Sequence, residues 1–150
     1  MTKKNSLNIT LGEALICILK SYGVKYIFGV PGGGSSLDLI AAAEQAGLEF
    51  VLCKGETSAA LAASVTGELT NSPGVVLTAI GPGAASAVNG VAYAHLEKAP
   101  LILISDARDA KPGAFPHQVF DLKSLFSPIT KANKQVKPSD GVKVFANLVR

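Results

Sequence analysis

Charged side chains are scarce in this sequence. Only 17% of its 150 residues are Asp, Glu, Lys or Arg, and 48% are apolar, whereas about 25% of the residues in an average soluble domain are charged. This balance excludes a chain that is disordered throughout, and it predicts extensive burial within the fold or against a partner. The length predicts one domain with one core.

The sequence also lacks a strong charge of one sign and a cysteine framework. The net charge is +3, and the positive excess lies in residues 123–150. A tail this weakly basic is unlike the basic stripe of a nucleic-acid-binding protein. Cys17 and Cys53 form no Cys-x-x-Cys motif, so we expect no disulfide framework, no zinc site and a cytoplasmic protein, with Cys17 in the core.

No long apolar run is uninterrupted. The segment 69–96 carries no formal charge, but proline and glycine residues break it. This pattern predicts a strand, a turn and a buried helix rather than a membrane span. The apolar stretch after the basic N-terminus is broken by polar residues, unlike a signal peptide.

Strands, glycine-rich turns and helices alternate along the first two thirds of the chain. Thr10 and Glu13 form a capping-box signature, and the strands are apolar without clean alternation, as in parallel sheets covered on both faces. The pattern predicts a doubly wound, mainly parallel α/β sheet, with helices over 11–22, 35–46, 57–69 and 83–96 and strands over 25–30, 49–53, 75–79 and 101–105. Downstream we expect a helix over 118–126, a weaker strand over 129–136, and a helix from 138 that is incomplete at residue 150.

The first glycine-rich turn, residues 29–35, follows a strand of this sheet. Ligands of doubly wound sheets bind at the carboxyl ends of strands. Bare backbone here allows close approach of a ligand, and Ser35 or Ser36 is expected to cap a helix whose start could receive a phosphate. The turn matches neither a dinucleotide fingerprint nor a P-loop, and it has an alternative interpretation as a tight connection only.

Two further turns follow the next strands. Residues 53–60 place Glu56 where a strand meets a helix, among Gly, Ala and Ser. Taken alone, Glu56 is also explained as an acidic residue favoured by the positive end of a helix. The turn around Gly81 has no reactive side chain, and by itself indicates packing.

Together, in this order, the three turns resemble the N-terminal pyrimidine-binding domain of thiamine-diphosphate-dependent enzymes, in the group of acetolactate synthase and pyruvate decarboxylase. The likeness covers nearly the whole chain, and the segments that carry it are 23–33, 56–60, 81–83, 99–104 and 128–131. The resemblance implies the α/β thiamine-diphosphate-binding fold. It also implies one pyrimidine-binding domain over residues 1–150, with its last helix and strand incomplete.

The resemblance assigns roles to particular residues. A glutamate at the position of Glu56 hydrogen-bonds N1′ of the cofactor's aminopyrimidine, which favours the tautomer that removes the thiazolium C2 proton. The thiazolium ring then accepts electrons from a 2-keto acid. The pyrimidine ring would be bordered by Pro31, Gly32, Ile80 and Gly81. Substrate-facing positions correspond to Phe115, His117 and Gln118, although an isolated loop histidine is more often merely solvated.

The family's Gly-Asp-Gly motif, which holds Mg²⁺ and the diphosphate, is absent from these residues. The resemblance therefore implies a separate diphosphate-binding domain or subunit and at least a dimer, with no metal ligand in this chain and with FAD as a further possibility. Gly55 and Ala85-Ser86 stand where relatives often carry His or Asn and Thr-Asn. We expect acetolactate-synthase-like carboligation first and 2-keto acid decarboxylation second. The rival hypothesis is a non-catalytic α/β domain that binds a partner or ligand.

Overall fold

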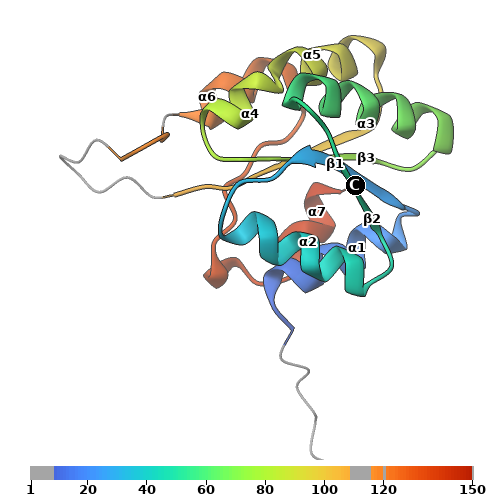
Figure 1. Ribbon diagram of the computed structural model, residues 1–150, viewed down its shortest axis with the longest axis vertical. Helices are drawn as coiled ribbons and strands as arrows, with labels where there is room; N and C mark the ends of the chain where they lie inside the picture. The colour runs from blue at the N-terminus through green and yellow to red at the C-terminus, as the bar shows by residue number, and fades with distance from the viewer. Residues whose placement is uncertain (1–8, 109–115, 120, 150) are drawn as a thin grey trace, which may run out of the picture.

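A four-stranded parallel sheet forms the centre of the protein, as seen in a computed structural model (Figure 1). The structure describes residues 9–108, 116–119 and 121–149. The sheet has the order β2-β1-β3-β4, and every pair of neighbours is parallel. Its strands are β1 (Tyr26–Val30), β2 (Glu49–Leu52), β3 (Gly74–Thr78) and β4 (Leu101–Ser105).

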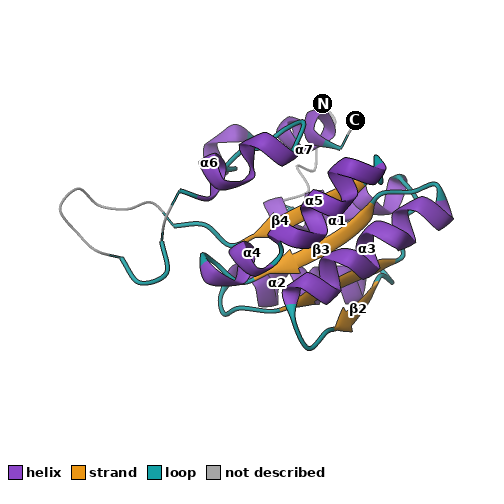
Figure 2. Cartoon of the chain, turned by 90° about the horizontal axis from the view of Figure 1, so that it is seen from above, coloured by secondary structure: helices purple, strands orange, loops and turns teal. Residues whose placement is uncertain are grey.

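Helices cover both faces of the sheet, which gives three layers (Figures 1 and 2). One face carries α1 (Leu11–Ser21), α2 (Ser35–Gln45) and α7 (Lys143–Leu148). The other carries α3 (Glu56–Thr70), α4 (Pro82–Ser86), α5 (Val88–Glu97) and α6 (Leu122–Phe126). The α/β sheet expected from the sequence is therefore confirmed. None of the helices in the described part of the chain is long and apolar enough to cross a membrane.

Strand β3 is buried along its whole length because β1 and β4 flank it and helices cover both its faces. Val75 and Leu77 face the core cluster that includes Ile16 and Leu19 of α1. Val76, on the opposite side of the strand, packs with the alanines of α3. This alternation explains why the strand is apolar throughout.

The small residues of α3 and α5 allow these two helices and the sheet to approach closely. A Cβ atom on Gly74 would lie 1.8 Å from the Ala63 carbonyl oxygen, and one on Gly90 would lie 2.4 Å from the Ala60 Cβ. Larger side chains at either position would push α3 away. The position of α3 is thus set by backbone-to-backbone packing.

The start of the fold matches the sequence closely. The expected capping box is present at α1: the Glu13 amide donates to Thr10 Oγ1 (3.2 Å), and the Thr10 amide donates to Glu13 Oε2 (2.6 Å). One expectation for this helix is wrong, because Cys17 is exposed. The buried residues Ile16 and Leu19 lie on the side of the helix that faces the core, and Cys17 lies on the other side.

Several downstream expectations are corrected by the structure. Residues 129–136 form no strand: the 3₁₀ helix η1 (Ser127–Ile129) precedes a run, 131–135, whose side chains are all exposed and offer no apolar face to a sheet. The helix expected over 118–126 begins at Leu122, where Asp121 accepts a hydrogen bond from the Ser124 amide (2.9 Å). The helix expected over 83–96 is divided between α4 and α5 at Ala87.

The last expected helix is also divided. The 3₁₀ helix η2 (Pro138–Asp140) is followed by Gly141, whose positive φ of 68° stops it before α7 begins. Glycine tolerates this left-handed conformation at no steric cost. Helix α7 then packs beneath the sheet beside α1.

Candidate functional site

The turns that follow the four strands meet at one edge of the sheet, because all four strands run in the same direction. This carboxyl edge brings together residues 31–34, 53–56, 79–82 and 106. It is the edge at which parallel sheets bind ligands. The residues predicted to bind the cofactor therefore all lie at this edge.

Glu56 is the first residue of α3, and its side chain is half-buried. Its carboxylate lies against the start of α4: a Cβ atom placed on Gly83 would be 3.1 Å from Glu56 Oε1 and 3.0 Å from the Ala79 Cβ. A side chain at position 83 would compete with the carboxylate for this space. The structure thus brings the second and third turns together, as the sequence analysis expects.

Two hydrogen bonds hold the first turn of α3. The Thr57 hydroxyl donates to the Ser86 carbonyl oxygen (2.5 Å), and the Ser58 hydroxyl donates to the Gly55 carbonyl oxygen (2.8 Å). The first of these ties α3 to α4. No hydrogen bond engages the Glu56 carboxylate within the described residues, so its oxygens are available to another donor, and the positive end of α3 stabilises a negative charge there.

The third turn also touches the loop that carries the expected substrate-facing residues. Gly81 has a φ of 61°, and a Cβ atom on it would lie 1.9 Å from the carbonyl oxygen of Gln118. Only glycine fits this contact. Gln118 is therefore adjacent to Gly81 through its backbone, while the side chains of His117 and Gln118 are exposed. Phe115 lies outside the described residues.

The first turn lies beside the third. Pro31, Gly32 and Ile80 are all half-buried. A Cβ atom on Gly32 would be 3.2 Å from the Ala79 Cβ and 3.1 Å from Asp106 Oδ2. The structure thus brings Gly32 next to the residue that precedes Ile80.

Asp106 is a residue of this edge that the sequence analysis missed. Its carboxylate accepts hydrogen bonds from the hydroxyls of Ser35 and Ser36, the second at 2.5 Å. The expectation that one of these serines caps α2 is wrong, because the N-cap position is Gly34 and makes no side-chain hydrogen bond. The carboxylate thus lies beside the helix start that was suggested for a phosphate. An acidic residue directly after the fourth strand, together with a Ser-Ser pair, was the available signal.

A cavity of about 100 Å³ lies away from this edge, at the opposite end of β1, between residues 23–26 and the end of α3. It contains none of the candidate residues. No group of three or more His, Cys, Asp or Glu side chains within the described ranges could hold a metal ion.

Comparison with known families agrees with this geometry. Residues 9–125 match the family described as "Thiamine pyrophosphate enzyme, N-terminal TPP binding domain". The chain belongs to this family. Thiamine pyrophosphate is thiamine diphosphate, so the family predicted from the three turns is confirmed.

Several thiamine pyrophosphate enzymes resemble this domain in sequence. It is 36% identical over 131 residues to "Probable acetolactate synthase large subunit" of Methanocaldococcus jannaschii, an alignment covering 87% of this chain and 22% of that protein. It is 35% identical over 127 residues to "Acetolactate synthase" of Bacillus subtilis, covering 83% and 22%. It is 33% identical over 123 residues to "2-hydroxyacyl-CoA lyase 2" of Mus musculus, covering 80% and 19%. The domain thus spans about a fifth of the length of these relatives.

Proposed function

We propose that this domain forms the pyrimidine side of a thiamine diphosphate site in an enzyme that acts on 2-keto acids, and that Glu56 is its cofactor-activating residue. The observation that carries the proposal is the Glu56 carboxylate, which lies at the carboxyl edge of the sheet against the bare backbone of Gly83. No described residue hydrogen-bonds this carboxylate. A half-buried carboxylate of this kind suits a ring nitrogen that shares a proton with it.

The surrounding residues fit a flat aromatic ring. Gly32, Gly81 and Gly83 leave the edge free of side chains at three positions, and Pro31 and Ile80 offer apolar surface beside them. In the proposal Pro31, Gly32, Ile80 and Gly81 border the pyrimidine, and Glu56 holds the proton at N1′. When bound, the cofactor supplies an electron sink for bond cleavage next to a carbonyl group.

The rest of the proposed active site lies outside these residues. In the proposal a diphosphate-binding domain or subunit holds the diphosphate through Mg²⁺, and two copies of the enzyme pair as a dimer in the cytoplasm. FAD is a further possible cofactor. The whole of residues 1–150 acts as one pyrimidine-binding domain.

The reaction we favour is acetolactate-synthase-like carboligation, with 2-keto acid decarboxylation as the second choice. Two of the relatives described above carry the name acetolactate synthase, one of them as "probable", which supports this order. The contact between Gly81 and the Gln118 backbone supports a position of the loop of His117 and Gln118 beside the proposed ring. These two side chains, with Phe115, are the proposed substrate-facing residues.

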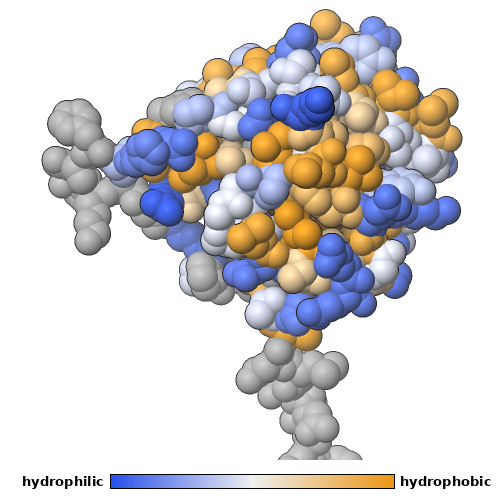
Figure 3. Space-filling model, in the orientation of Figure 1, coloured by the Kyte–Doolittle hydropathy of each residue, from blue (hydrophilic) through white to orange (hydrophobic). Residues whose placement is uncertain are grey.

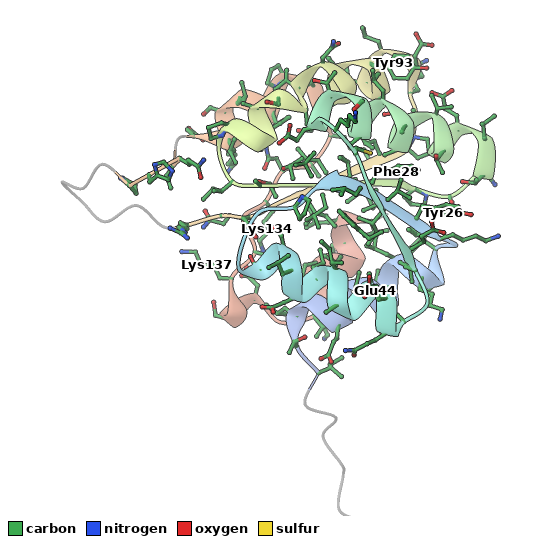
Figure 4. The ribbon with its side chains drawn as sticks, viewed as in Figure 1. Tyr26, Phe28, Glu44, Tyr93, Lys134 and Lys137 are labelled. Atoms are coloured by element: carbon green, nitrogen blue, oxygen red, sulfur yellow. The ribbon has the colours of Figure 1, made fainter. Side chains whose placement is uncertain are left out.

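The test is Glu56→Gln in the complete enzyme, meaning this domain together with its diphosphate-binding domain. Glutamine keeps the size of the side chain but cannot hold the proton, so we expect exchange of the cofactor's C2 proton, followed by NMR, to slow by at least about a hundredfold. The matched control is Glu44→Gln, since Glu44 lies exposed on α2 away from the site (Figure 4). Unchanged exchange in a folded Glu56→Gln protein would show that Glu56 is only a helix-start residue.

A further inference from the structure

A cluster of three side chains joins two turns of the carboxyl edge, and none of the three lies in the short segments that carry the family likeness of the sequence. Asp106 follows β4, while Ser35 and Ser36 begin α2. Oδ1 of Asp106 accepts the Ser35 hydroxyl and Oδ2 accepts the Ser36 hydroxyl. Each carboxylate oxygen therefore binds a different serine.

From this cluster we infer that Asp106 is a positioning residue, which holds the turn of Pro31 and Gly32 in the form that the pyrimidine ring requires. The inference rests on the proposed function, since it concerns the same site. The turn is the connection between β1 and α2, and Asp106 fastens the α2 end of that connection to the end of β4, which lies two strands away from β1 in the sheet.

The turn has few other restraints. Gly32, Gly33 and Gly34 lack side chains, and Gly34 has a positive φ of 65°. Neither Gly33 nor Gly34 would bring a Cβ within 4 Å of another described atom. Backbone with so little packing has high conformational freedom unless hydrogen bonds hold its ends. The two serine hydrogen bonds supply that restraint at the α2 end.

The contact is also costly to lose. Ser36 is only 1% exposed, so its hydroxyl would be left buried without a partner if the carboxylate were removed. Hydrogen bonds to a charged acceptor are stronger than neutral ones. The negative charge is further stabilised by the N-terminus of α2, a helix of 11 residues.

The geometry links the cluster directly to the proposed ring site. Asp106 Oδ2 lies 3.1 Å from the position of a Cβ on Gly32. Movement of the carboxylate would therefore change the space beside Gly32. We expect an effect on cofactor affinity that exceeds the effect on turnover at saturating cofactor.

The experiment compares Asp106→Ala and Asp106→Asn in the complete enzyme. Thiamine diphosphate is titrated at saturating Mg²⁺ by calorimetry, and kcat is measured at saturating cofactor. We expect Asp106→Ala to raise the Kd about tenfold, which corresponds to loss of the charged hydrogen-bond acceptor. Asp106→Asn keeps an acceptor and should raise it only about two- to threefold, and kcat should change less than Kd in both.

A second readout needs no cofactor. Hydrogen exchange of the backbone amides in residues 32–36 should speed up in Asp106→Ala, while exchange in β3 stays slow. The matched control is Asp38→Ala, because Asp38 is an exposed acid in the first turn of the same helix. It should leave both readouts unchanged. If Asp106→Ala does not fold, Ser35→Ala removes one hydrogen bond from an exposed hydroxyl and should raise the Kd by a smaller factor.

The outcomes separate the two proposals. A wild-type enzyme that does not bind thiamine diphosphate would overturn the proposed function, and the positioning role with it. A wild-type enzyme that binds the cofactor, with the same Kd and amide exchange in the Asp106 and Ser35 variants, would overturn the positioning role alone.

Discussion

At the scale of single residues, the contact between Gly83 and Glu56 predicts a variant whose stability and activity change differently. Gly83 is the second residue of α4, so alanine there should favour the helix by up to about 1 kcal/mol. The new methyl would lie 3.1 Å from Glu56 Oε1 and move the carboxylate by a few tenths of an ångström. We expect Gly83→Ala to keep the free energy of unfolding within about 1 kcal/mol of the wild type and to lower kcat about tenfold in the complete enzyme.

Gly12→Ala is the matched control for that variant. Gly12 is also the second residue of a helix, and its Cβ would meet only ordinary contacts at 3.7 Å and 3.9 Å. We expect unchanged kcat and equal or higher stability, by urea unfolding. An equal fall in kcat for both variants would mean that the Glu56 contact has no role in activity.

A second residue-scale prediction concerns pH. The Thr10 amide and hydroxyl donate to the exposed Glu13 carboxylate and lower its pKa below the ordinary value of 4.5. A carboxyl whose pKa is lowered by folding stabilises the protein above its unfolded pKa, and the contribution is lost as the pH falls through the folded pKa. Glu13→Gln should therefore unfold at lower urea concentration than the wild type at pH 7, and the two midpoints should converge as the pH falls through the folded-state pKa of Glu13. A gap that stays constant as the pH is lowered well below 4.5 would contradict this assignment to ionisation.

At the scale of helices and strands, most of the first 105 residues were predictable because short-range signals agree with long-range packing there, although the helix expected over 83–96 is divided. The strands β1 to β4 and the capped helix α1 are found within one or two residues of the expected bounds. The strand over 129–136 failed because strand formation depends on an apolar face, and the exposed residues 131–135 in the middle of the segment offer none.

The candidate site was predictable to the same degree. Glu56 and the glycine turns could be found because glycine is required where backbones meet, as at Gly81. Asp106 was missed because its partners lie about 70 positions away in the sequence. The acid after the fourth strand and the Ser-Ser pair are both visible in the sequence, but no short motif links them.

Packing of α5 on α3 leads to a prediction at this scale. A Cβ on Gly90 would lie 2.4 Å from the Ala60 Cβ and 3.0 Å from the Ala60 carbonyl carbon. Gly90→Ala should push the helices apart and destabilise the protein by about 1–3 kcal/mol, despite the higher helix propensity of alanine. Because Ala60 lies one turn after Glu56, kcat should fall as well. Urea unfolding and steady-state assays check both, and a more stable Gly90→Ala protein would show that the helices separate at little cost.

At the scale of the whole molecule, the low charge content corresponds to an apolar surface. Figure 3 shows apolar side chains on the face where the β2 edge lies. Leu52 is 71% exposed, Leu69 81% and Leu96 76%. Exposed apolar surface of this kind is typical of regions that other domains or subunits cover, which is consistent with a domain that spans about a fifth of its relatives.

The last prediction concerns which domain holds Mg²⁺ and the diphosphate in the proposed function. In the proposed function, Mg²⁺ and the diphosphate bind on another domain, while Glu56 acts only on the pyrimidine. Removal of Mg²⁺ with EDTA should release thiamine diphosphate from the complete enzyme. In a Mg²⁺ titration at a fixed, high concentration of thiamine diphosphate, the Mg²⁺ concentration at which half of the enzyme has bound the cofactor should be the same in wild type and Glu56→Gln. Only the wild type should exchange the C2 proton quickly. A tenfold higher Mg²⁺ requirement in Glu56→Gln would instead place a metal contact on this domain.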